Sequence, residues 1–303
     1  MKSPRIKIYA ILSVFALCIC AVHVSASPQF EGLRETGVRT LEVEASLLDV
    51  EVNGVPGSTL TVRGEDISKN IAVKYKRRGD VLRVWVEKRF YPLTLRKSGS
   101  LYIEVPMDTG VELKSSTGEI VIRNMESDLF STESSSGNIS ISNVFTDVRA
   151  KSSSGDINIG MIEGSVYGES SSGRIEVINV NGGVYLSASS GDLRLSAIEG
   201  NIEAASSSGR IILNTIKGAL RIKTSSGDIT GEDVLISGDS VFESSSGRID
   251  MNLDNQLNGL TFRLKSSSGK LEVGNLSGEK NLAAGEGTIR ITGETSSGDQ
   301  TYR

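Results

Sequence analysis

The chain has little of the side-chain chemistry on which most enzymes depend. Its 303 residues include two cysteines, one histidine and one tryptophan, and only 5% of them are aromatic. The cysteines are Cys18 and Cys20 and the histidine is His23, so all three lie close to the N-terminus. The rest of the chain therefore offers no disulfide, thiol nucleophile, imidazole base or Cys/His zinc site. We expect no metal and no cofactor.

Residues 1–26 have the pattern of a secretory signal peptide. A start with three cations precedes an apolar run at 8–22, and small residues suited to cleavage occupy 24–26. The alternative is an uncleaved anchor, but this run is shorter than the ~20 residues that span a bilayer as a helix. We therefore expect a secreted protein, or one of the periplasm or cell envelope, without a stable transmembrane anchor after cleavage.

The charge balance argues against a nucleic-acid partner. The formal net charge is −4 for the whole chain, and loss of the three cations of the signal segment makes it −4 − 3 = −7. An acidic protein of this kind repels the phosphate backbone. We expect no binding to nucleic acid.

A Ser-Ser-Gly motif recurs along the chain at a nearly fixed step. The glycines of this motif, the last of them in a degenerate copy, are Gly118, Gly137, Gly155, Gly173, Gly191, Gly209, Gly227, Gly247, Gly269 and Gly287. Most neighbours are separated by 18 residues, and the largest gap is 22. A short fixed period is typical of one supersecondary unit stacked on copies of itself. The pattern predicts an all-β, single-stranded β-helix, or β-solenoid, with ~18-residue rungs.

Apolar residues follow the same step. Counted from each repeat glycine, positions +2 and +4 are apolar, as in Ile157 and Ile159, and predict a strand with one buried face. Position +7 is also apolar and breaks the alternation, so we expect a corner near +6, where Asn124 and Asn179 tolerate a left-handed backbone. A second glycine at +9 precedes a second strand with apolar +11 and +13.

We divide the chain into three parts that form one elongated body after cleavage. Residues 1–26 are the signal peptide, 27–112 are irregular β-rich rungs with a cap, and 113–303 are the repeat β-helix continuous with them. A hairpin that turns at Arg78-Gly79-Asp80 is expected to cap the first edge of the solenoid. The polar tail from Gly293 is expected to cover the other edge, because open strand edges invite aggregation.

The residue after each repeat glycine alternates in charge from rung to rung. This predicted structural charge ladder consists of Asp156, Arg174, Asp192, Arg210, Asp228 and Arg248. Opposite charges on neighbouring rungs fix the register of stacked strands. Each exposed pair contributes under ~1 kcal/mol, so the ladder favours specificity more than stability.

Tyr167 and Tyr185 are the candidate ligand-binding residues. Both lie at position +12, between two inward positions, so their side chains should point outward and stack on adjacent rungs. An exposed aromatic step can bind a sugar ring or a protein. The alternative is an ordinary cross-strand pair that shields the backbone.

The chain resembles the bacterial family labelled "putative adhesin", whose function is unknown. The Leu-Tyr-Ile-Glu-Val-Pro sequence at 101–106 and repeats such as Ser-Ser-Ser-Gly-Asp-Ile at 152–157 carry the resemblance. The resemblance implies a single-stranded β-helix of envelope or secreted proteins, and it supplies no catalytic motif. Function does not follow from fold.

Three further functional hypotheses are alternatives to a surface that binds a glycan or a protein through the tyrosines. A glycan-active enzyme would use the ladder aspartates, but the neighbouring arginines favour their ionised form, which does not suit a general acid. Calcium-binding solenoids need an aspartate in every half-turn, whereas here Asp alternates with Arg. The tripeptide at 78–80 is of integrin-binding type, although a turn needs such residues anyway.

The stretch 63–97 carries eleven Lys or Arg against four acids. It can dock on an anionic polymer or lipid, or it can be the solvated face of a hairpin. With the other observations, the sequence favours a non-enzymatic extracytoplasmic β-helix, an adhesin-like surface or envelope protein with a glycan or an envelope protein as partner. The alternatives are an envelope-stress or assembly accessory that acts through a protein partner, and a glycan-active enzyme.

Overall fold

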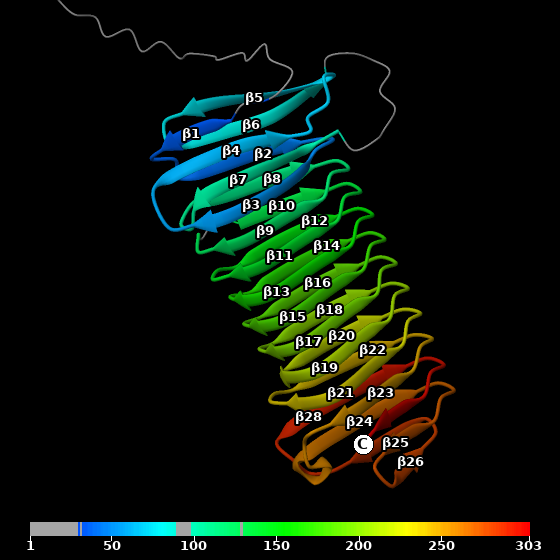
Figure 1. Ribbon diagram of the computed structural model, residues 1–303. Helices are drawn as coiled ribbons and strands as arrows, with labels where there is room; N and C mark the ends of the chain where they lie inside the picture. Colours follow the sequence, from blue (N-terminus) through cyan, green and yellow to red (C-terminus); the bar gives the residue numbers. More distant parts are fainter. Residues whose placement is uncertain (1–29, 31, 89–97, 128–129) are drawn as a thin grey trace, which may run out of the picture.

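The protein is a β-solenoid made of two long, facing sheets (Figure 1). The computed structural model describes residues 30, 32–88, 98–127 and 130–303, so the expected signal peptide at 1–26 lies outside the described residues. Within the described part, sheet A has 15 strands and sheet B has 14. None of the helical structure among these residues is long and apolar enough to cross a membrane. The predicted β-solenoid is confirmed.

Each regular rung gives one strand to each sheet, and neighbouring rungs pair in parallel. The strands of sheet A in this region are β9 (Ile120–Met125), β11 (Ile139–Val144), β13 (Ile157–Glu163), β15 (Ile175–Asn181), β17 (Leu193–Glu199), β19 (Ile211–Gly218), β21 (Ile229–Ile236) and β23 (Ile249–Leu253). Those of sheet B are β8 (Gly110–Ser115), β10 (Phe130–Ser134), β12 (Val148–Ser152), β14 (Val166–Ser170), β16 (Val184–Ala188), β18 (Ile202–Ser206), β20 (Leu220–Thr224) and β22 (Ser240–Ser244).

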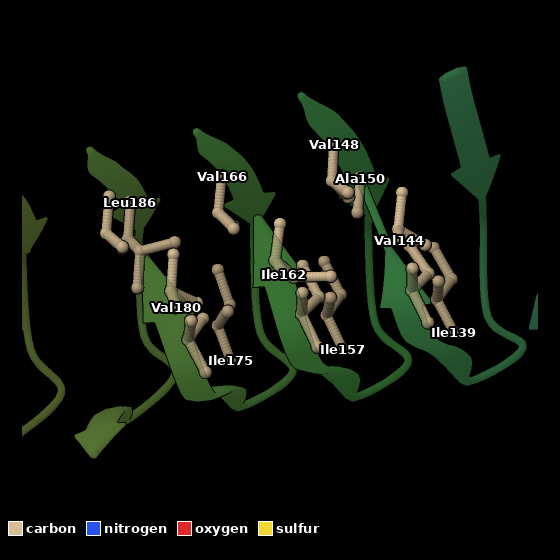
Figure 2. Packing of buried hydrophobic residues seen from close by; sticks show 14 of the residues in the cluster. Ile139, Val144, Val148, Ala150, Ile157, Ile162, Val166, Ile175, Val180 and Leu186 are labelled. Carbon is tan, nitrogen blue, oxygen red and sulfur yellow. The ribbon is translucent and has the colours of Figure 1, made fainter. Parts of the chain in front are cut away.

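The core is a stack of aliphatic layers between the two sheets. Figure 2 shows Ile157 and Ile162 of one rung pointing toward Val166 of the facing strand, with equivalent side chains in the rungs on either side. Ile157 and Val166 are fully buried. Burial of one such side chain contributes about 1.5–3 kcal/mol. A single rung is too small to fold alone, so each rung depends on its neighbours.

The expected break at position +6 is a left-handed residue inside the sheet A strand. The residues with this backbone, all with φ between 52° and 60°, are Asn124, Asn143, Met161, Asn179, Ala197, Thr215 and Asp233. This left-handed residue shifts the alternation of inward and outward side chains by one position. The side chains at +2, +4 and +7 therefore all point inward. Asn143 also donates its side-chain N–H to the Asn124 side chain at 2.5 Å.

The Ser-Ser-Gly turn packs backbone against backbone. A methyl group at Gly209 would lie 1.9 Å from the carbonyl oxygen of Gly191 in the preceding rung. The hydroxyl of Ser206 accepts the Gly209 N–H at 2.9 Å and donates to the Gly191 carbonyl at 3.3 Å. Thr224 makes the same pair of contacts one rung later. Glycine is thus required by close approach, and serine or threonine closes the turn.

The N-terminal end departs from chain order. Its strands are β1 (Leu33–Thr36), β2 (Thr40–Ala45), β3 (Asp49–Val55), β4 (Thr59–Glu65), β5 (Ile71–Arg78), β6 (Val81–Lys88) and β7 (Ser100–Pro106). The first rung, β2–β3, lies between rungs β6–β7 and β8–β9. Beyond them, β4 and β5 run antiparallel to their neighbours. The predicted hairpin at 78–80 is confirmed, and its strand β5 ends sheet B.

The C-terminal end repeats this arrangement with η1 (Leu257–Gly259), β24 (Leu260–Ser266), β25 (Leu271–Val273), β26 (Leu276–Gly278), β27 (Asn281–Ala284), β28 (Ile289–Thr295) and β29 (Gln300–Tyr302). The last rung, β28–β29, lies between β22–β23 and β24–β25. The antiparallel strands β26 and β27 form the edge instead.

Two sequence expectations are therefore wrong. The tail from Gly293 does not cover an edge, because it pairs on both sides within the sheets. Gly287 does not belong to the Ser-Ser-Gly column, since it packs on Gly259 at the start of a sheet B strand. The turn glycine of the last rung is Gly298, which packs between Gly247 and Gly269.

Candidate functional site

The charged residues at position +1 contact one another from rung to rung. Arg174 Nη2 lies 2.8 Å from Asp156 Oδ2, and Arg210 Nη2 lies 2.8 Å from Asp192 Oδ2. The other oxygen of each carboxylate accepts the backbone N–H of the same arginine at 2.9 Å. Asp228 likewise accepts the Arg248 N–H at 2.8 Å. Each aspartate thus satisfies a backbone donor that faces it from the next rung.

The contacts of Asp192 favour the ionised form of its carboxylate. Partial burial raises the pKa of Asp192, but hydrogen bonds from the Arg210 backbone and guanidinium outweigh it, so the pKa lies below its ordinary value. A hydrogen bond to Asp156 raises the pKa of Arg174. A general acid needs a carboxyl that holds its proton near neutral pH. The arrangement therefore helps to fix the register of the stacked strands and does not favour proton transfer.

The last rung extends this ladder in space. Asp299 lies between Arg248 and Lys270, because β29 is inserted between β23 and β25. Its carboxylate accepts the Lys270 N–H at 2.8 Å. The two cations, neighbours in the sequence repeat, are thus separated by an anion, as charge alternation requires.

A second charge ladder runs along the outer face of sheet B, and sequence analysis missed it. Its ion pairs are Lys114–Glu133, Lys151–Glu169, Lys223–Glu243 and Lys265–Glu294, with N–O distances of 2.9–3.8 Å. At the N-terminal end, Glu44 of the same column is paired diagonally with Arg83 at 3.0 Å. In the repeats these residues immediately precede the serine-rich turn. The signal was available as the alternation of Glu133, Lys151 and Glu169.

This second ladder has a neutral gap. Ser187 and Ala205 occupy its positions between Glu169 and Lys223. We call the surface formed by Tyr167, Tyr185, Ser187 and Ala205 the neutral window. It is flanked along sheet B by ion pairs, so it is the part of this ladder that is least costly to desolvate.

The two tyrosines lie together in this window, as their spacing predicts. Their rings are stacked with centroids 5.0 Å apart and an interplanar angle of 9°. The Arg149 guanidinium lies 4.8 Å from the Tyr167 ring centroid, so it covers the other face of that ring. Tyr185 is 40% exposed, and its second face is directed toward the rung of Glu203. Their binding role stays a prediction.

The other sequence candidates are placed as follows. Arg78, Gly79 and Asp80 are exposed at the β5–β6 turn. The basic stretch is partly described, and its ion pairs there include Lys74 with Glu87, Arg77 with Glu35 and Arg83 with Glu44. Residues 89–97 lie outside the described residues. In the described ranges no three His, Cys, Asp or Glu side chains are grouped to hold a metal ion.

Sheet A carries an exposed apolar group that the sequence analysis did not find. Phe145 and Met161 are 45% and 55% exposed and line the same shallow surface groove, while Ile178 is 38% exposed in a neighbouring one beside Gly160. Met161 projects because its backbone is left-handed (φ 57°). The sequence contains a signal for this group: these apolar residues occupy repeat positions that are mostly polar in the other rungs.

The comparisons with known proteins agree with this architecture. The Toastrack DUF4097 family model matches residues 33–211 and 146–303. The chain belongs to this family. No curated protein matches it.

Two solved structures show some similarity to the chain. One is a "putative cell adhesion protein" from Clostridium sporogenes, with 10% identity over 90% of this chain and 98% of that one and a TM-score of 0.18. The other is a "putative adhesin" from Bacteroides fragilis, with 10% identity over 91% of this chain and 99% of that one and a TM-score of 0.31.

Proposed function

We propose that this Toastrack protein is a non-enzymatic extracytoplasmic rod that binds a glycan chain across the neutral window of sheet B. The observation that carries the proposal is the coincidence of the exposed tyrosine stack with the gap in the second ladder. A partner that lies there displaces water from aromatic, hydroxyl and methyl groups. Elsewhere along this ladder it would have to displace water from ion pairs, which costs more.

The window has the chemistry that sugars need. Tyr185 offers an aromatic face and edge, and Ser187 with the two phenol groups supplies neutral hydrogen-bonding hydroxyls. Arg149 and Glu203 border the tyrosines in the same outward column and add a donor and an acceptor. The parallel strands repeat every ~4.8 Å, so an extended chain along the rod meets a regular surface.

The ladder aspartates support a binding role over catalysis. They are committed to backbone N–H groups and arginines, as described above for Asp156 and Asp192. Glycoside hydrolysis needs one carboxyl that keeps its proton beside one that does not. The pKa of Asp192 is lowered, so this carboxyl does not keep its proton as the general acid must.

The test is binding of the purified protein to a panel of envelope polysaccharides, with analysis of the products of each hit. We expect binding without cleavage, and a double change of Tyr167→Ala with Tyr185→Ala should weaken it by about tenfold or more. The matched control is Tyr102→Ala, which removes an outward tyrosine of sheet A. Ala205→Glu should also weaken binding, because it closes the neutral gap and leaves the tyrosines intact. Cleavage products, or equal effects of the control, would contradict the proposal.

The apolar group on sheet A favours a second candidate, an accessory that acts through a protein partner. Exposed Phe and Met side chains that gather on a surface are typical of protein interfaces. Partner capture in cells that is lost with Phe145→Ser and Met161→Ser, and kept in the tyrosine variants, would favour this candidate over glycan binding.

A further inference from the structure

The two ends of the rod differ in charge. At the N-terminal end, the last strand of sheet B is β5, which carries Lys74, Lys76, Arg77 and Arg78 and no acid. At the C-terminal end, the last strand, β27, carries no charge. The described part of the basic stretch, 63–88, has eight Lys or Arg against four acids, whereas the whole chain has a net charge of −4. The protein is therefore an acidic rod with one basic end.

Two of the cations at this end are not neutralised by a neighbour. The ion pairs of β5 involve Lys74 and Arg77. Lys76 and Arg78 form no ion pair with any residue that the structure describes. Arg78 is exposed, and Lys76 is partly exposed on the outer face of the strand, which alternates with the buried side chains that begin at Ile71. Their charge is available to an anionic partner.

The only tryptophan of the chain lies beside these cations. Trp85 is opposite Lys74 in the β5–β6 ladder, and the Arg83 guanidinium lies 5.8 Å from its ring centroid. The Trp85 side chain is partly exposed, and its N–H donates to Glu87 at 2.9 Å. Tryptophan and basic side chains are enriched where proteins meet the interface of a bilayer, because each joins an apolar body to a polar end. A soluble polyanion would need only the cations.

The apolar run of the sequence is connected to this same end. Phe30 packs against Tyr75 of β5, with ring centroids 6.4 Å apart. Figure 1 shows β1, β5 and β6 together at this end of the rod. The apolar run at 8–22 ends eight residues before Phe30. Eight residues span at most about 28 Å. As long as that run is in a membrane, the basic end is held near the membrane surface.

We propose that the basic end of the rod docks on an anionic lipid bilayer, with Lys76 and Arg78 at the phosphate groups and Trp85 at the interface. Acidic residues begin on the next strand of sheet B, where Glu42 and Glu44 lie in β2, so the end of the rod makes the contact and not its side. Six strand spacings separate β5 from β14, the first strand of the neutral window. At ~4.8 Å for each spacing, docking holds the window about 30 Å from the membrane and leaves it free for a glycan.

The experiment is sedimentation of the purified protein with vesicles of phosphatidylglycerol, and with vesicles of phosphatidylcholine as the neutral reference. We expect tighter binding to the anionic vesicles, weakened by salt, and a shift of the Trp85 emission to shorter wavelength as the indole leaves water. Each cation near an anionic surface contributes about fivefold in affinity, so Lys76→Gln with Arg78→Gln should weaken binding about 25-fold. The matched control, Arg221→Gln with Arg263→Gln, removes two exposed cations farther along sheet B and should leave binding unchanged.

A soluble anionic polymer is the competing partner, and inorganic polyphosphate is the probe for it. Polyphosphate can bind the cations, but it should leave the Trp85 emission unchanged. The tyrosine variants that test the glycan site should bind vesicles as the wild type does, so the two proposals can fail separately. Absence of binding to phosphatidylglycerol vesicles would overturn the proposal. So would vesicle binding without an emission shift, an equal shift with polyphosphate, or equal binding of the two double variants.

Discussion

The middle of the solenoid and its two ends follow different rules of chain order. In the middle, from β8 to β23, each rung lies beside the rungs that precede and follow it in sequence. At each end the rung β2–β3 or β28–β29 lies inside a parallel rung that is farther from the end of the chain in sequence, and reversed strands lie outside both. A solenoid in simple order would leave its first and last rungs at the edges, where strands fray. Here these rungs pair on both sides.

The difference shows where each kind of specificity comes from. Repetition positions the middle rungs, because the turn glycines from Gly137 to Gly247 each stack on the glycine of the preceding rung, and the charges at position +1 from Asp156 to Arg248 alternate in sign. The ends cannot use repetition alone, since a slipped rung would satisfy the same pattern. At the C-terminal end, the ladder itself selects the inserted rung, because Asp299 fits between Arg248 and Lys270.

The largest effect is expected from a turn glycine in the middle. Gly209→Ala places a methyl group 1.9 Å from the Gly191 carbonyl oxygen, with backbone on both sides that cannot move aside. We expect a loss of about 3 kcal/mol or more in the free energy of unfolding, measured by urea denaturation. Gly259→Ala is the control near the C-terminal end, because nothing lies within 4 Å of its added methyl group. Similar losses in both variants would contradict the stacking argument.

The inserted rung is tested by Asp299→Arg. The change removes the acceptor of the Lys270 N–H and places three cations in a row, so we expect a loss of about 2 kcal/mol. The control is Asp254→Arg, which changes an exposed aspartate outside the ladder. Equal thermal unfolding of the two variants would mean that Asp299 is not enclosed by Arg248 and Lys270.

The role of the ladder aspartates in the middle is tested at Asp192. Asp192→Ala leaves the Arg210 N–H without its acceptor and should cost about 1 kcal/mol. Asp192→Asn keeps an acceptor oxygen and should cost less. The folded-state pKa is lowered, so the ionic contribution is present above the unfolded pKa of ~3.9 and is lost as the pH falls through the folded value. The stability difference between wild type and Asp192→Asn should therefore shrink on acidification; an unchanged difference would contradict this.

The smallest effect is a gain at position +6. Thr215 is β-branched and has φ 54°, a conformation that Asn tolerates better. Thr215→Asn should raise the free energy of unfolding by about 1 kcal/mol. Thr230→Asn, at an exposed strand position without positive φ, should give no gain. A gain of equal size at both positions would show that side-chain chemistry, and not backbone conformation, is responsible.

Much of the middle was predictable from the sequence, because local spacing determines it. The inward positions, the left-handed +6 residue and the contact between Tyr167 and Tyr185 all follow from an 18-residue step. The order at the C-terminal end was not predicted, since Gly298 lies 29 residues after Gly269. A clue was present in the sequence: Arg248 and Lys270 break the sign alternation, and Asp299 supplies the missing charge.

The neutral window was only half predicted. The tyrosine stack follows from position +12, but its significance depends on Ser187 and Ala205 in the adjacent column. That column is visible only when the residues before each serine turn are aligned between rungs. The exposure of Met161 was not predicted either, because a left-handed residue that is not Asn or Gly is uncommon.

The rung order at the C-terminal end can be tested most directly by disulfide crosslinking. In the structure Asp250 pairs with Thr301, and Thr301 pairs with Glu272 on its other side. In a chain with Cys18 and Cys20 changed to serine, Asp250→Cys with Thr301→Cys should form a disulfide under mild oxidation, because neighbouring strands bring the two Cα atoms within reach. Asp250→Cys with Glu272→Cys should not. The reverse result, a bond between 250 and 272 but none between 250 and 301, would contradict the inserted terminal rung.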